Sequence, residues 1–478
     1  MPKTNITRRN LIKLFGAAST LAAASDRPNI ILCMGDDHGW NETSYNGHPH
    51  VKTPVLDEMA ANGLRLDRFY SAHPNCSPTR GSIMTGRHPN RYGTFAPGWS
   101  IRPEEITIAQ LLRKAGYACG HFGKWHLGPV KAGSPTNPGA MRFEEWLSHD
   151  NFFEVDPILS RNGGPPEKYP GESSAIVVRA ALQFIAKAKR ESRPSFTMVW
   201  FGSPHEPYFG TEPYLSMYKD LTDPIRSRLA EISAMDFAIG QLRDELRKTE
   251  LRDNTLLWYC GDNGVPPEGR LTTPYRGAKG QVYEGGVRVP GIIEWPARLK
   301  ARKSSVPAVT TDMLPTLCEI TGTPLPKRPL DGISLKPLLD DKMKERPKPI
   351  FFWEFNSTQE IKRNPEPYLA ADLQEGTTPT AKLMAGKYTR SFRNFKHPRI
   401  DATDSAGPGA VLGNRHKLVV DGGEESSREL FDLAADRGET TNLAKKQPAM
   451  VEKLERELRA WQKSVLNSLS GADYSVNN

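Results

Sequence analysis

Short apolar runs alternate along most of this chain with longer segments in which apolar residues recur every three or four positions. Four of the runs cover residues 29–34, 117–122, 195–201 and 256–260. Continuous apolar runs of this length are typical of buried strands, and a three- to four-residue spacing is typical of amphipathic helices. The alternation predicts an α/β fold in which a large, mixed but mostly parallel sheet lies between helices.

We expect three helices between the strands, and capping residues bound two of them. One helix begins after Thr53 and ends at Gly63, a second begins after Thr107 and ends at Gly116, and a longer one covers about residues 227–248. Threonine favours the position before the first helical turn, and glycine favours the position after the last. We expect these helices to be scaffold.

A proline- and lysine-rich stretch at residues 336–349 separates the last part of the chain from the rest. Such stretches are typical of domain boundaries. We therefore expect a main domain over residues 25–345 and a smaller one over residues 346–478. Strands of the smaller domain are predicted at residues 350–355 and 416–420.

The final helix carries its apolar residues on one face, which consists of Val451, Leu454, Leu458, Trp461 and Val465. This spacing predicts a helix that docks on the body of the protein. The other face mixes glutamate with arginine, which argues against the alternative of a membrane-surface helix.

Residues 359–408 show no readable period. Within them, residues 387–396 interleave basic with aromatic side chains, a pattern that a solvated loop or an edge strand explains equally well. Because loops carry most binding specificity, we expect specificity to reside in segments such as 129–170 and 359–410.

The first 24 residues have the order of an export leader. Arg8 and Arg9 stand in a basic segment, and an apolar run from Leu14 to Ala24 ends in small residues. The pattern resembles a twin-arginine signal peptide, with a disordered basic tail as the alternative. No stretch of about 18 apolar residues occurs, so no membrane span is expected. We expect an exported protein, periplasmic or secreted.

The charge of the chain bears on its partners. The formal charge of the 478 residues is +9, and it falls to +5 without residues 1–24, which carry four bases and no acid. A mildly basic chain without a basic stripe or a binding motif gives no reason to expect nucleic acid. It gives weak support to an acidic partner such as a sulfated glycan.

The five cysteines form an odd, widely spaced set without a CxxC pair: Cys33, Cys76, Cys119, Cys260 and Cys318. No disulfide framework is therefore expected. Three of them lie within or beside apolar runs and are expected to pack in the core, namely Cys33, Cys119 and Cys260.

Polar side chains follow all four of the predicted strands. In chain order they are Asp36, Asp37, Lys124, His126, His205, Asp262 and Asn263. Ligands of open α/β sheets bind beyond the carboxyl ends of the strands. We therefore expect one site at this edge instead of four unrelated loops.

Two of the strand ends supply only oxygen ligands, from Asp36, Asp37, Asp262 and Asn263. Oxygen donors suit Ca²⁺ or Mg²⁺, whereas a zinc site would include histidine or cysteine. Asp-Asp and Asp-Asn-Gly are also common turn sequences. Because both pairs stand at strand ends, the metal interpretation is favoured.

Cys76 stands in the segment Cys76-Ser77-Pro78-Thr79-Arg80, where a helix is expected to begin. Most free cysteines are small buried apolar residues. A helix N-terminus favours anions, and the planar donors of Arg80 suit an oxyanion. These features favour a functional Cys76.

The segment that begins at Cys76 resembles the formylglycine signature of sulfatases. Residues 116–128 resemble the second signature of that family, and residues 277–280 with 284–290 resemble a later block. A weaker match covers residues 429–433. The chain is most similar to the branch of arylsulfatase A and N-acetylgalactosamine-6-sulfatase. Asn75 and Cys119 depart from the residues usual in the family, which bears on local packing and modification efficiency.

The resemblance implies an alkaline-phosphatase-like fold with a smaller C-terminal domain that holds an antiparallel sheet and a helix. It implies that a formylglycine-generating enzyme oxidises Cys76 to 3-oxoalanine (formylglycine). One divalent cation, usually Ca²⁺ with Mg²⁺ as the alternative, would be held by Asp36, Asp37, Cys76, Asp262 and Asn263.

The resemblance also implies roles for the remaining groups. Arg80 and Lys124 would hold the aldehyde hydrate and the sulfate, with Lys279 on the sulfate or the bridging oxygen. His126 would pair with the hydrate, and His205 would donate a proton to the leaving alcohol. Ser148 matches a position that contacts sulfate.

Together these features predict a sulfuric ester hydrolase whose substrate is a sulfated carbohydrate, with aryl sulfates as artificial substrates. Two alternatives stay open. One is a phosphodiesterase or phosphonate monoester hydrolase of the same superfamily, and the other is a non-catalytic glycan-binding relative. The predicted set of ligands for a single cation favours sulfate over the two-metal phosphatases of this fold.

Overall fold

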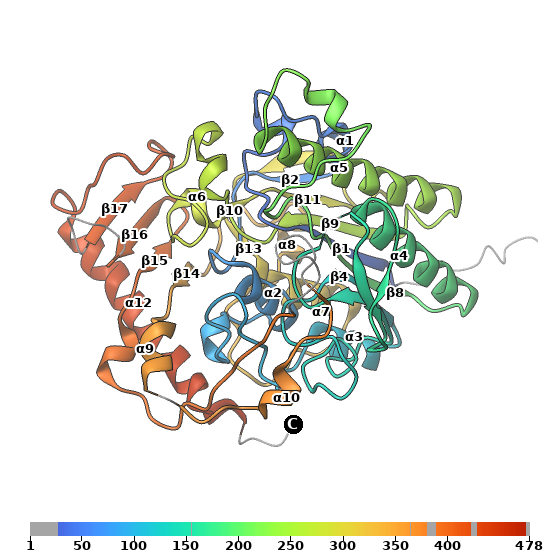
Figure 1. Ribbon diagram of the computed structural model, residues 1–478. Helices are drawn as coiled ribbons and strands as arrows, with labels where there is room; N and C mark the ends of the chain where they lie inside the picture. Colours follow the sequence, from blue (N-terminus) through green and yellow to red (C-terminus); the bar gives the residue numbers. More distant parts are fainter. Residues whose placement is uncertain (1–26, 154, 364, 380–388, 422–427, 475–478) are drawn as a thin grey trace, which may run out of the picture.

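Five parallel strands form the centre of a ten-stranded sheet in the computed structural model, which describes residues 27–153, 155–363, 365–379, 389–421 and 428–474 (Figure 1). Across the sheet the strands are β12 (Arg302–Ser304), β2 (Leu64–Leu66), β11 (Gly291–Glu294), β9 (Thr255–Gly261), β1 (Asn29–Gly35), β8 (Ser195–Trp200), β4 (Ala118–Lys124), β5 (Glu145–His149), β6 (Ile158–Arg161) and β7 (Glu167–Lys168). The strands β9, β1, β8, β4 and β5 are parallel, whereas β11 is antiparallel to both β9 and β2. The predicted large, mostly parallel sheet is confirmed. The predicted leader lies outside the described residues.

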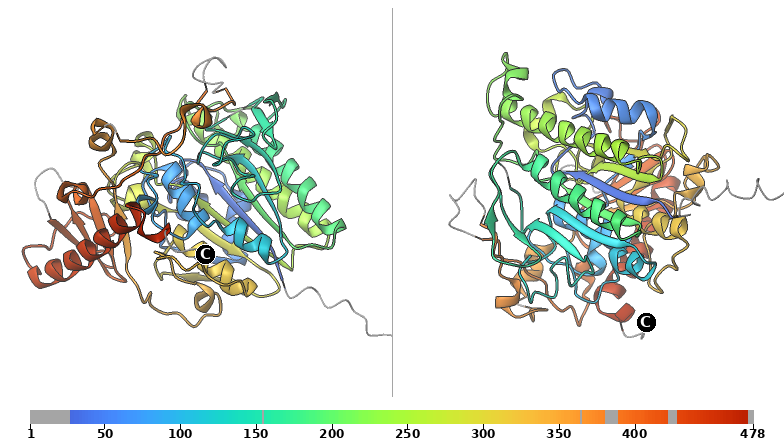
Figure 2. Two further views of the ribbon diagram at one scale, coloured as in Figure 1. Left: turned by 90° about the horizontal axis from the view of Figure 1, so that it is seen from below. Right: turned by 90° about the vertical axis from the view of Figure 1, so that its right-hand side faces the viewer.

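Alternate residues of β1 point into two cores on opposite faces of the sheet. Ile30, Leu32 and Met34 belong to one core, and Ile31 and Cys33 to the other. The first core packs against α2 (Cys76–Thr85), α3 (Ile108–Lys114), α7 (Met313–Thr321) and α8 (Lys336–Leu339). The second packs against α1 (Pro54–Asn62), α4 (Ser173–Arg190) and α5 (Ile225–Lys248), of which α4 and α5 lie side by side in Figure 2.

The predicted scaffold helices are present as α1, α3 and α5. Thr107 caps α3, because its hydroxyl accepts a hydrogen bond from the backbone N–H of Gln110 at 3.2 Å. The predicted core cysteines Cys33, Cys119 and Cys260 are buried, as expected. All five cysteines are free thiols, so the absence of a disulfide framework is also confirmed.

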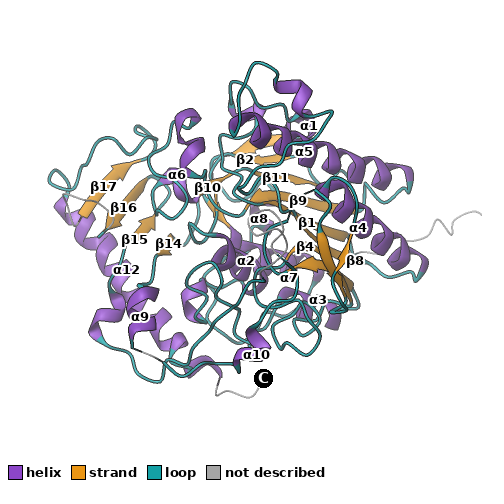
Figure 3. Ribbon diagram, in the orientation of Figure 1, coloured by secondary structure: helices purple, strands orange, loops and turns teal. Residues whose placement is uncertain are grey.

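A second, four-stranded sheet forms the end of the molecule at the left of Figure 3. Its strands are antiparallel and lie in chain order: β14 (Ile350–Trp353), β15 (Gly409–Leu412), β16 (His416–Val420) and β17 (Arg428–Asp432). The remaining short elements include β3 (Phe69–Tyr70), α6 (Glu284–Val287), β10 (Arg288–Val289), β13 (Ala308–Val309), α9 (Ser357–Lys362) and α10 (Ala371–Gln374). The expected antiparallel C-terminal sheet is confirmed, while the domain boundary at residue 345 stays a prediction.

The final helix, α12 (Pro448–Leu469), packs as predicted. Its buried residues include all five of the expected apolar face, and Trp461 stacks on Phe351 with ring centroids 4.9 Å apart. Every helix within the described residues is too short or too polar to cross a membrane.

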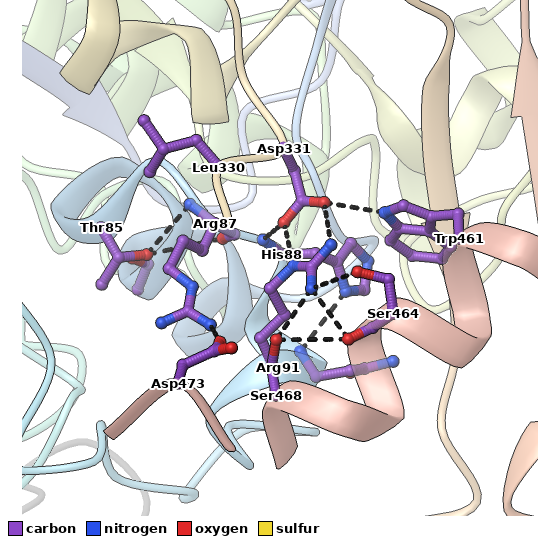
Figure 4. Close-up of polar contacts among 12 residues, drawn as sticks. Thr85, Arg87, His88, Arg91, Leu330, Asp331, Trp461, Ser464, Ser468 and Asp473 are labelled. Atoms are coloured by element: carbon purple, nitrogen blue, oxygen red, sulfur yellow. Dashed lines mark hydrogen bonds and ion pairs between the residues drawn. The ribbon is translucent and has the colours of Figure 1, made fainter. Parts of the chain in front are cut away.

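A buried polar cluster joins α12 to the main sheet domain (Figure 4). The Asp331 carboxylate accepts hydrogen bonds from the Arg91 guanidinium at 2.7 and 2.8 Å and from the Trp461 indole at 2.7 Å. Arg91 also donates to Ser468 at 2.9 Å. Burial opposes ionisation of Asp331, but Arg91 and the backbone N–H of His88 outweigh it and hold its pKa well below the ordinary value.

We predict that Asp331→Ala lowers the free energy of unfolding by about 3–5 kcal/mol, because it leaves Arg91 buried without its carboxylate. Denaturant titration of both proteins measures this change. The matched control is Asp340→Ala, since Asp340 pairs with Arg298 at 3.1 Å at a more exposed position. That loss should be about 1 kcal/mol or less. Equal losses in the two variants would contradict the role of Asp331.

The same carboxylate predicts a pH dependence. Its pKa is depressed in the folded state, so its contribution is complete above the unfolded pKa of about 3.9 and disappears as the pH falls through the lower folded pKa. The stability difference between wild type and Asp331→Ala should therefore be constant at neutral pH and shrink below about pH 4.

Candidate active site

Polar residues at the ends of four neighbouring strands, β9, β1, β8 and β4, meet at one edge of the main sheet. The last paired residues of β1 and β9 are Gly35 and Gly261. The residues that follow the two strands therefore begin at the same height in the sheet. The backbone N–H of Asp37 donates to the Asp262 carboxylate at 2.9 Å, and Asn263 donates to the Asp37 carboxylate at 2.9 Å. The expected convergence of the strand ends is thus present.

Cys76 lies beside these carboxylates at the first residue of α2. One ligand atom each of Asp36, Cys76 and Asp262 lies within 4.8 Å of the others, and the same holds for Asp36, Asp37 and His205. The thiol is 1% exposed. Burial raises the pKa of Cys76, so an unmodified cysteine here would be a thiol at neutral pH and a poor nucleophile.

Each of the three carboxylates is paired with a different cation. Arg80 donates to Asp262 at 2.8 Å, Lys124 donates to Asp36 at 2.6 Å, and Lys279 donates to Asp37 at 2.6 Å. A further bond from Arg80 to the Lys124 carbonyl at 2.8 Å fixes the guanidinium between α2 and β4. The predicted cations and carboxylates therefore form one buried, charged cluster.

The three carboxylates differ in their tendency to ionise. Burial raises the pKa of Asp262 to about 7, the charge of Asp36 adds to this, and Arg80 opposes it. Burial also opposes ionisation of Asp36 and Asp37, but Lys124 near the first and Lys279 near the second hold their pKa values below the ordinary range. Extra positive charge in the cluster would ionise all three.

Two buried oxygens of this cluster lack a hydrogen-bond donor among the described residues. They are Oδ1 of Asp36, which Arg80 approaches only to 3.5 Å, and Oδ1 of Asn263. Buried oxygens without donors are costly unless another partner is present. With the three carboxylates they form an oxygen-rich donor set of the kind that hard divalent cations prefer. The residues present therefore fit a divalent cation.

His126 is buried next to this cluster with both ring nitrogens unpaired among the described residues. It follows the end of β4 with a positive φ of 56°. Burial and then the charge of Lys124 hold its pKa well below the ordinary value, so the ring is neutral. A neutral imidazole with a free nitrogen can accept a proton.

His205 stands on the outer side of the carboxylates. Its Nδ1 donates to the Glu206 carbonyl at 2.5 Å, and its Nε2 lies 3.6 Å from the Asp37 carboxylate. Phe152 stacks on the ring at 4.5 Å. Burial lowers the pKa of His205 to about 4, while Asp37 and Asp36 oppose the shift. The Glu206 carbonyl fixes the tautomer, leaving Nε2 as the nitrogen that can exchange a proton toward a ligand.

Ser148 has a different environment from the other predicted residues. It lies in β5, where its hydroxyl bonds to Nδ1 of His121 at 2.8 Å and is buried. The next residues anchor a C-terminal segment, since the Asp150 carboxylate accepts two backbone N–H bonds from Thr377 and Thr378 at 2.7 Å. The structure therefore groups nine of the predicted side chains with Cys76 but gives Ser148 a structural partner.

Two residues near the site were not predicted. Phe152 stacks on His205 and lies 6.0 Å from the Lys124 ammonium, and nothing in the sequence around it indicates this contact. Arg390 acts electrostatically on both Cys76 and His126. Arg390 lies in the run of basic and aromatic residues at 387–396. That run was the only feature of the sequence that could have indicated it, and a loop or an edge strand explains the run equally well.

The family model described as Sulfatase matches residues 28–323. The chain belongs to the sulfatase family. The human arylsulfatase A is 33% identical over 470 residues, which cover 90% of this chain and 86% of that protein. The dog N-acetylgalactosamine-6-sulfatase is 30% identical over 389 residues, covering 72% of each.

Solved structures show the same fold. A protein crystallised with its substrate D-glucosamine-2-N,6-O-disulfate superposes with a TM-score of 0.69 at 19% identity, covering 94% of this chain and 100% of that one. The phosphonate monoester hydrolase of Agrobacterium radiobacter superposes with a TM-score of 0.65 at 19% identity, covering 93% and 97%. At these identities the likeness concerns the alkaline-phosphatase-like fold alone.

Membership in the sulfatase family defines the reaction class. The family match and the sulfatase relatives support hydrolysis of sulfate esters and do not favour the phosphodiesterase or glycan-binding alternatives. This sulfatase is a sulfuric ester hydrolase. Its acidic cluster is the candidate site for a divalent metal.

We predict that Ca²⁺ raises the melting temperature of this sulfatase and that Asp262→Asn abolishes the shift. A cation that binds only the folded protein stabilises it by about 2.7 kcal/mol at a hundredfold excess over its dissociation constant. The asparagine keeps the size of the side chain but removes its charge. Thermal unfolding with Ca²⁺, Mg²⁺ or a chelator measures the effect.

The control for this experiment is Glu294→Gln, which removes another buried carboxylate that pairs with Arg243 at 2.8 Å, away from the cluster. That variant should keep the full Ca²⁺ shift. Loss of the folded state in Asp262→Asn without added metal would show that Asp262 is a structural carboxylate instead of a ligand.

Proposed function

We propose that this sulfatase removes sulfate from a carbohydrate, using formylglycine derived from Cys76 and one divalent cation, usually Ca²⁺. The observation that supports it is the buried cluster around Cys76, in which Asp36, Asp37 and Asp262 each face a cation. A sulfated sugar is proposed because a relative is named N-acetylgalactosamine-6-sulfatase and a structural neighbour holds a sulfated glucosamine. Export through the leader and maturation by a formylglycine-generating enzyme belong to the same proposal.

An aldehyde hydrate at position 76 would supply the hydroxyl that attacks sulfur and a second hydroxyl that lets the aldehyde re-form, and a cation held by the carboxylates would add positive charge. Serine at this position would stay sulfated. The set of ligands proposed for the cation is Asp36, Asp37, Asp262, Asn263 and the side-chain oxygen at position 76.

The basic residues of the cluster would bind the sulfate. Lys124 and Lys279 pair with Asp36 and Asp37 at 2.6 Å in this structure. If these carboxylates held a cation, both ammonium groups would be free to bind an anion instead. Together with Arg80 they would stabilise the negative charge of the transferring sulfuryl group, which is the usual function of fixed cations in such sites.

The two histidines would move protons at different steps. His126 is neutral and has ring nitrogens unpaired among the described residues, so it could take the proton of the second hydroxyl while the carbon–oxygen bond to the sulfate breaks and the aldehyde re-forms. His205 would protonate the leaving alcohol from Nε2, since Nδ1 is held by the Glu206 carbonyl. The charge of a bound sulfate raises the protonated fraction of His205. Ser148 is left out of the proposed site because His121 holds its hydroxyl.

Mass spectrometry of the peptide that contains Cys76 tests the proposal directly. In active protein from a host with the maturation enzyme, residue 76 should be an aldehyde, and activity should follow the aldehyde fraction. Cys76→Ala should lose turnover entirely. Full activity with only the free thiol at position 76 would overturn the proposed chemistry.

Rates on the sulfate and phosphate esters of the same phenol test the substrate class in the same preparation. The sulfate ester should turn over faster, because the single proposed cation leaves a less charged site than two-metal phosphatases have. Faster turnover of the phosphate ester would reverse the assignment.

His205→Ala should reduce the hydrolysis of alkyl sulfates by about 10²–10⁴-fold, in the range of a lost general acid. Activated aryl sulfates, whose phenolate leaves without a proton, should lose far less. Steady-state rates on a sugar sulfate and on 4-nitrophenyl sulfate measure the difference. Equal losses on both would assign the acid role to another group.

A further inference from the structure

Two short stretches from the C-terminal part of the chain lie beside the site. We call residues 374–379 and 389–395 the strap. Its first arm is held by Asp150, whose carboxylate accepts hydrogen bonds from the N–H groups of Thr377 and Thr378 and from the Thr378 hydroxyl, each at 2.7 Å. His149 contacts the Pro379 carbonyl at 3.1 Å. These anchors are the last residue of β5 and the residue that follows it.

The second arm of the strap is fixed to the loop that follows α2. The N–H of Arg393 donates to the Gly98 carbonyl at 3.0 Å, and the N–H of Ser100 donates to the Arg393 carbonyl at 2.9 Å. The two arms are joined by a bond from the N–H of Gly376 to the Arg390 carbonyl at 2.9 Å. The backbone of Arg390 is therefore held on both sides.

The side chain of Arg390 lies against the loop next to the nucleophile position. Gly98 has a φ of 86°, and a Cβ added there would lie 2.7 Å from the Arg390 guanidinium. The N–H of Gly98 in turn reaches the Ser77 hydroxyl, one residue after Cys76, at 3.4 Å. Phe392, two residues along the strap, contacts the His126 ring at 6.2 Å between centroids. The arginine therefore stands between the strap and the site.

Arg390 differs from the other cations of the site because no described carboxylate pairs with it. Arg80, Lys124 and Lys279 each face an aspartate. Burial lowers the pKa of Arg390, which shows that its charge is partly removed from water without a partner. Residues 380–388, outside the described part, contain no aspartate or glutamate. A partly buried charge of this kind is stabilised by an anion.

We propose that Arg390 binds a second anionic group of the substrate, a sulfate or a carboxylate carried by the same glycan as the scissile sulfate ester. This inference rests on the proposed function. A sulfate ester carries one negative charge, which Arg80, Lys124, Lys279 and the divalent cation already balance. The planar guanidinium donates two parallel hydrogen bonds to a carboxylate or sulfate. Arg390 is thus a specificity-determining residue for polyanionic sugars.

The test compares sugars that inhibit hydrolysis of 4-nitrophenyl sulfate, which carries a single anion. N-acetylgalactosamine 6-sulfate supplies one anion, its 4,6-disulfate adds a sulfate, and a 6-sulfated disaccharide with glucuronate adds a carboxylate. Wild type should bind at least one of the two-anion sugars more tightly than the one-anion sugar. If the disulfated sugar binds more tightly, the second anion is a sulfate; if the glucuronate disaccharide does, it is a carboxylate.

In Arg390→Ala the tighter binding of the preferred two-anion sugar should disappear. Inhibition by that sugar should become about 10- to 100-fold weaker. The loss in kcat/KM for 4-nitrophenyl sulfate should be at least tenfold smaller. Arg390→Lys should recover part of the binding, because it restores the charge without the planar fork. The matched control is Arg393→Ala on the same strap, whose side chain is exposed and which should behave as wild type.

Three outcomes would overturn the inference. One is a wild type that binds one-anion and two-anion sugars equally, and another is an Arg390→Ala variant that keeps the preference. The third is an equal loss on 4-nitrophenyl sulfate, which would place Arg390 on the scissile sulfate.

Failure of the proposed function is recognised separately. A wild type with formylglycine at position 76 that hydrolyses no sulfate ester would contradict it. Calorimetric binding of the same sugars to Cys76→Ala, with and without Arg390→Ala, then still measures the second-anion preference without turnover. Loss of that preference in the double variant supports the inference, and its persistence overturns it.

Discussion

Three buried carboxylates, Asp36, Asp37 and Asp262, meet at the carboxyl edge of the sheet, and the rest of the site is arranged around their charge. Like charges at this separation in a dry environment repel strongly. The protein balances them with Lys124, Lys279 and Arg80, each bonded to a different carboxylate. The three side chains that offset the charge of the carboxylates are therefore also the ones that could hold an anion in the proposed site.

Two parts of the chain meet at the site: the carboxyl edge of the main sheet and the strap. The parallel strands β1, β4 and β9 position the charged cluster through their register, so its geometry depends on the paired strands inside the main sheet. The strap comes from the C-terminal part and reaches the site through Asp150 and Gly98. In the proposed function, residues at the sheet edge would carry the chemistry, and the strap would contact the rest of the substrate.

The sequence predicted the sheet edge well and the strap poorly, for a physical reason. Apolar runs that end in polar pairs report a strand and its end directly, which is why Asp36 and Asp262 could be placed together before any coordinates. The partner of the Ser148 hydroxyl depends on which strand lies next to β5, and no local pattern encodes that neighbour. Arg390 was missed because its position follows from backbone anchors far away in the chain, at Asp150 and Gly98.

The first turn of α2 has a consequence for how active protein is made. Every residue from Cys76 to Thr85 is buried in the folded chain. Under the proposed chemistry, a modifying enzyme would not reach the thiol once the helix has docked, so oxidation would compete in time with folding for each newly made chain. A chain that folded first would keep its sulfur. The specific activity of a preparation would then record the ratio of two rates in the cell that produced it, and neither storage nor added metal would raise it afterwards.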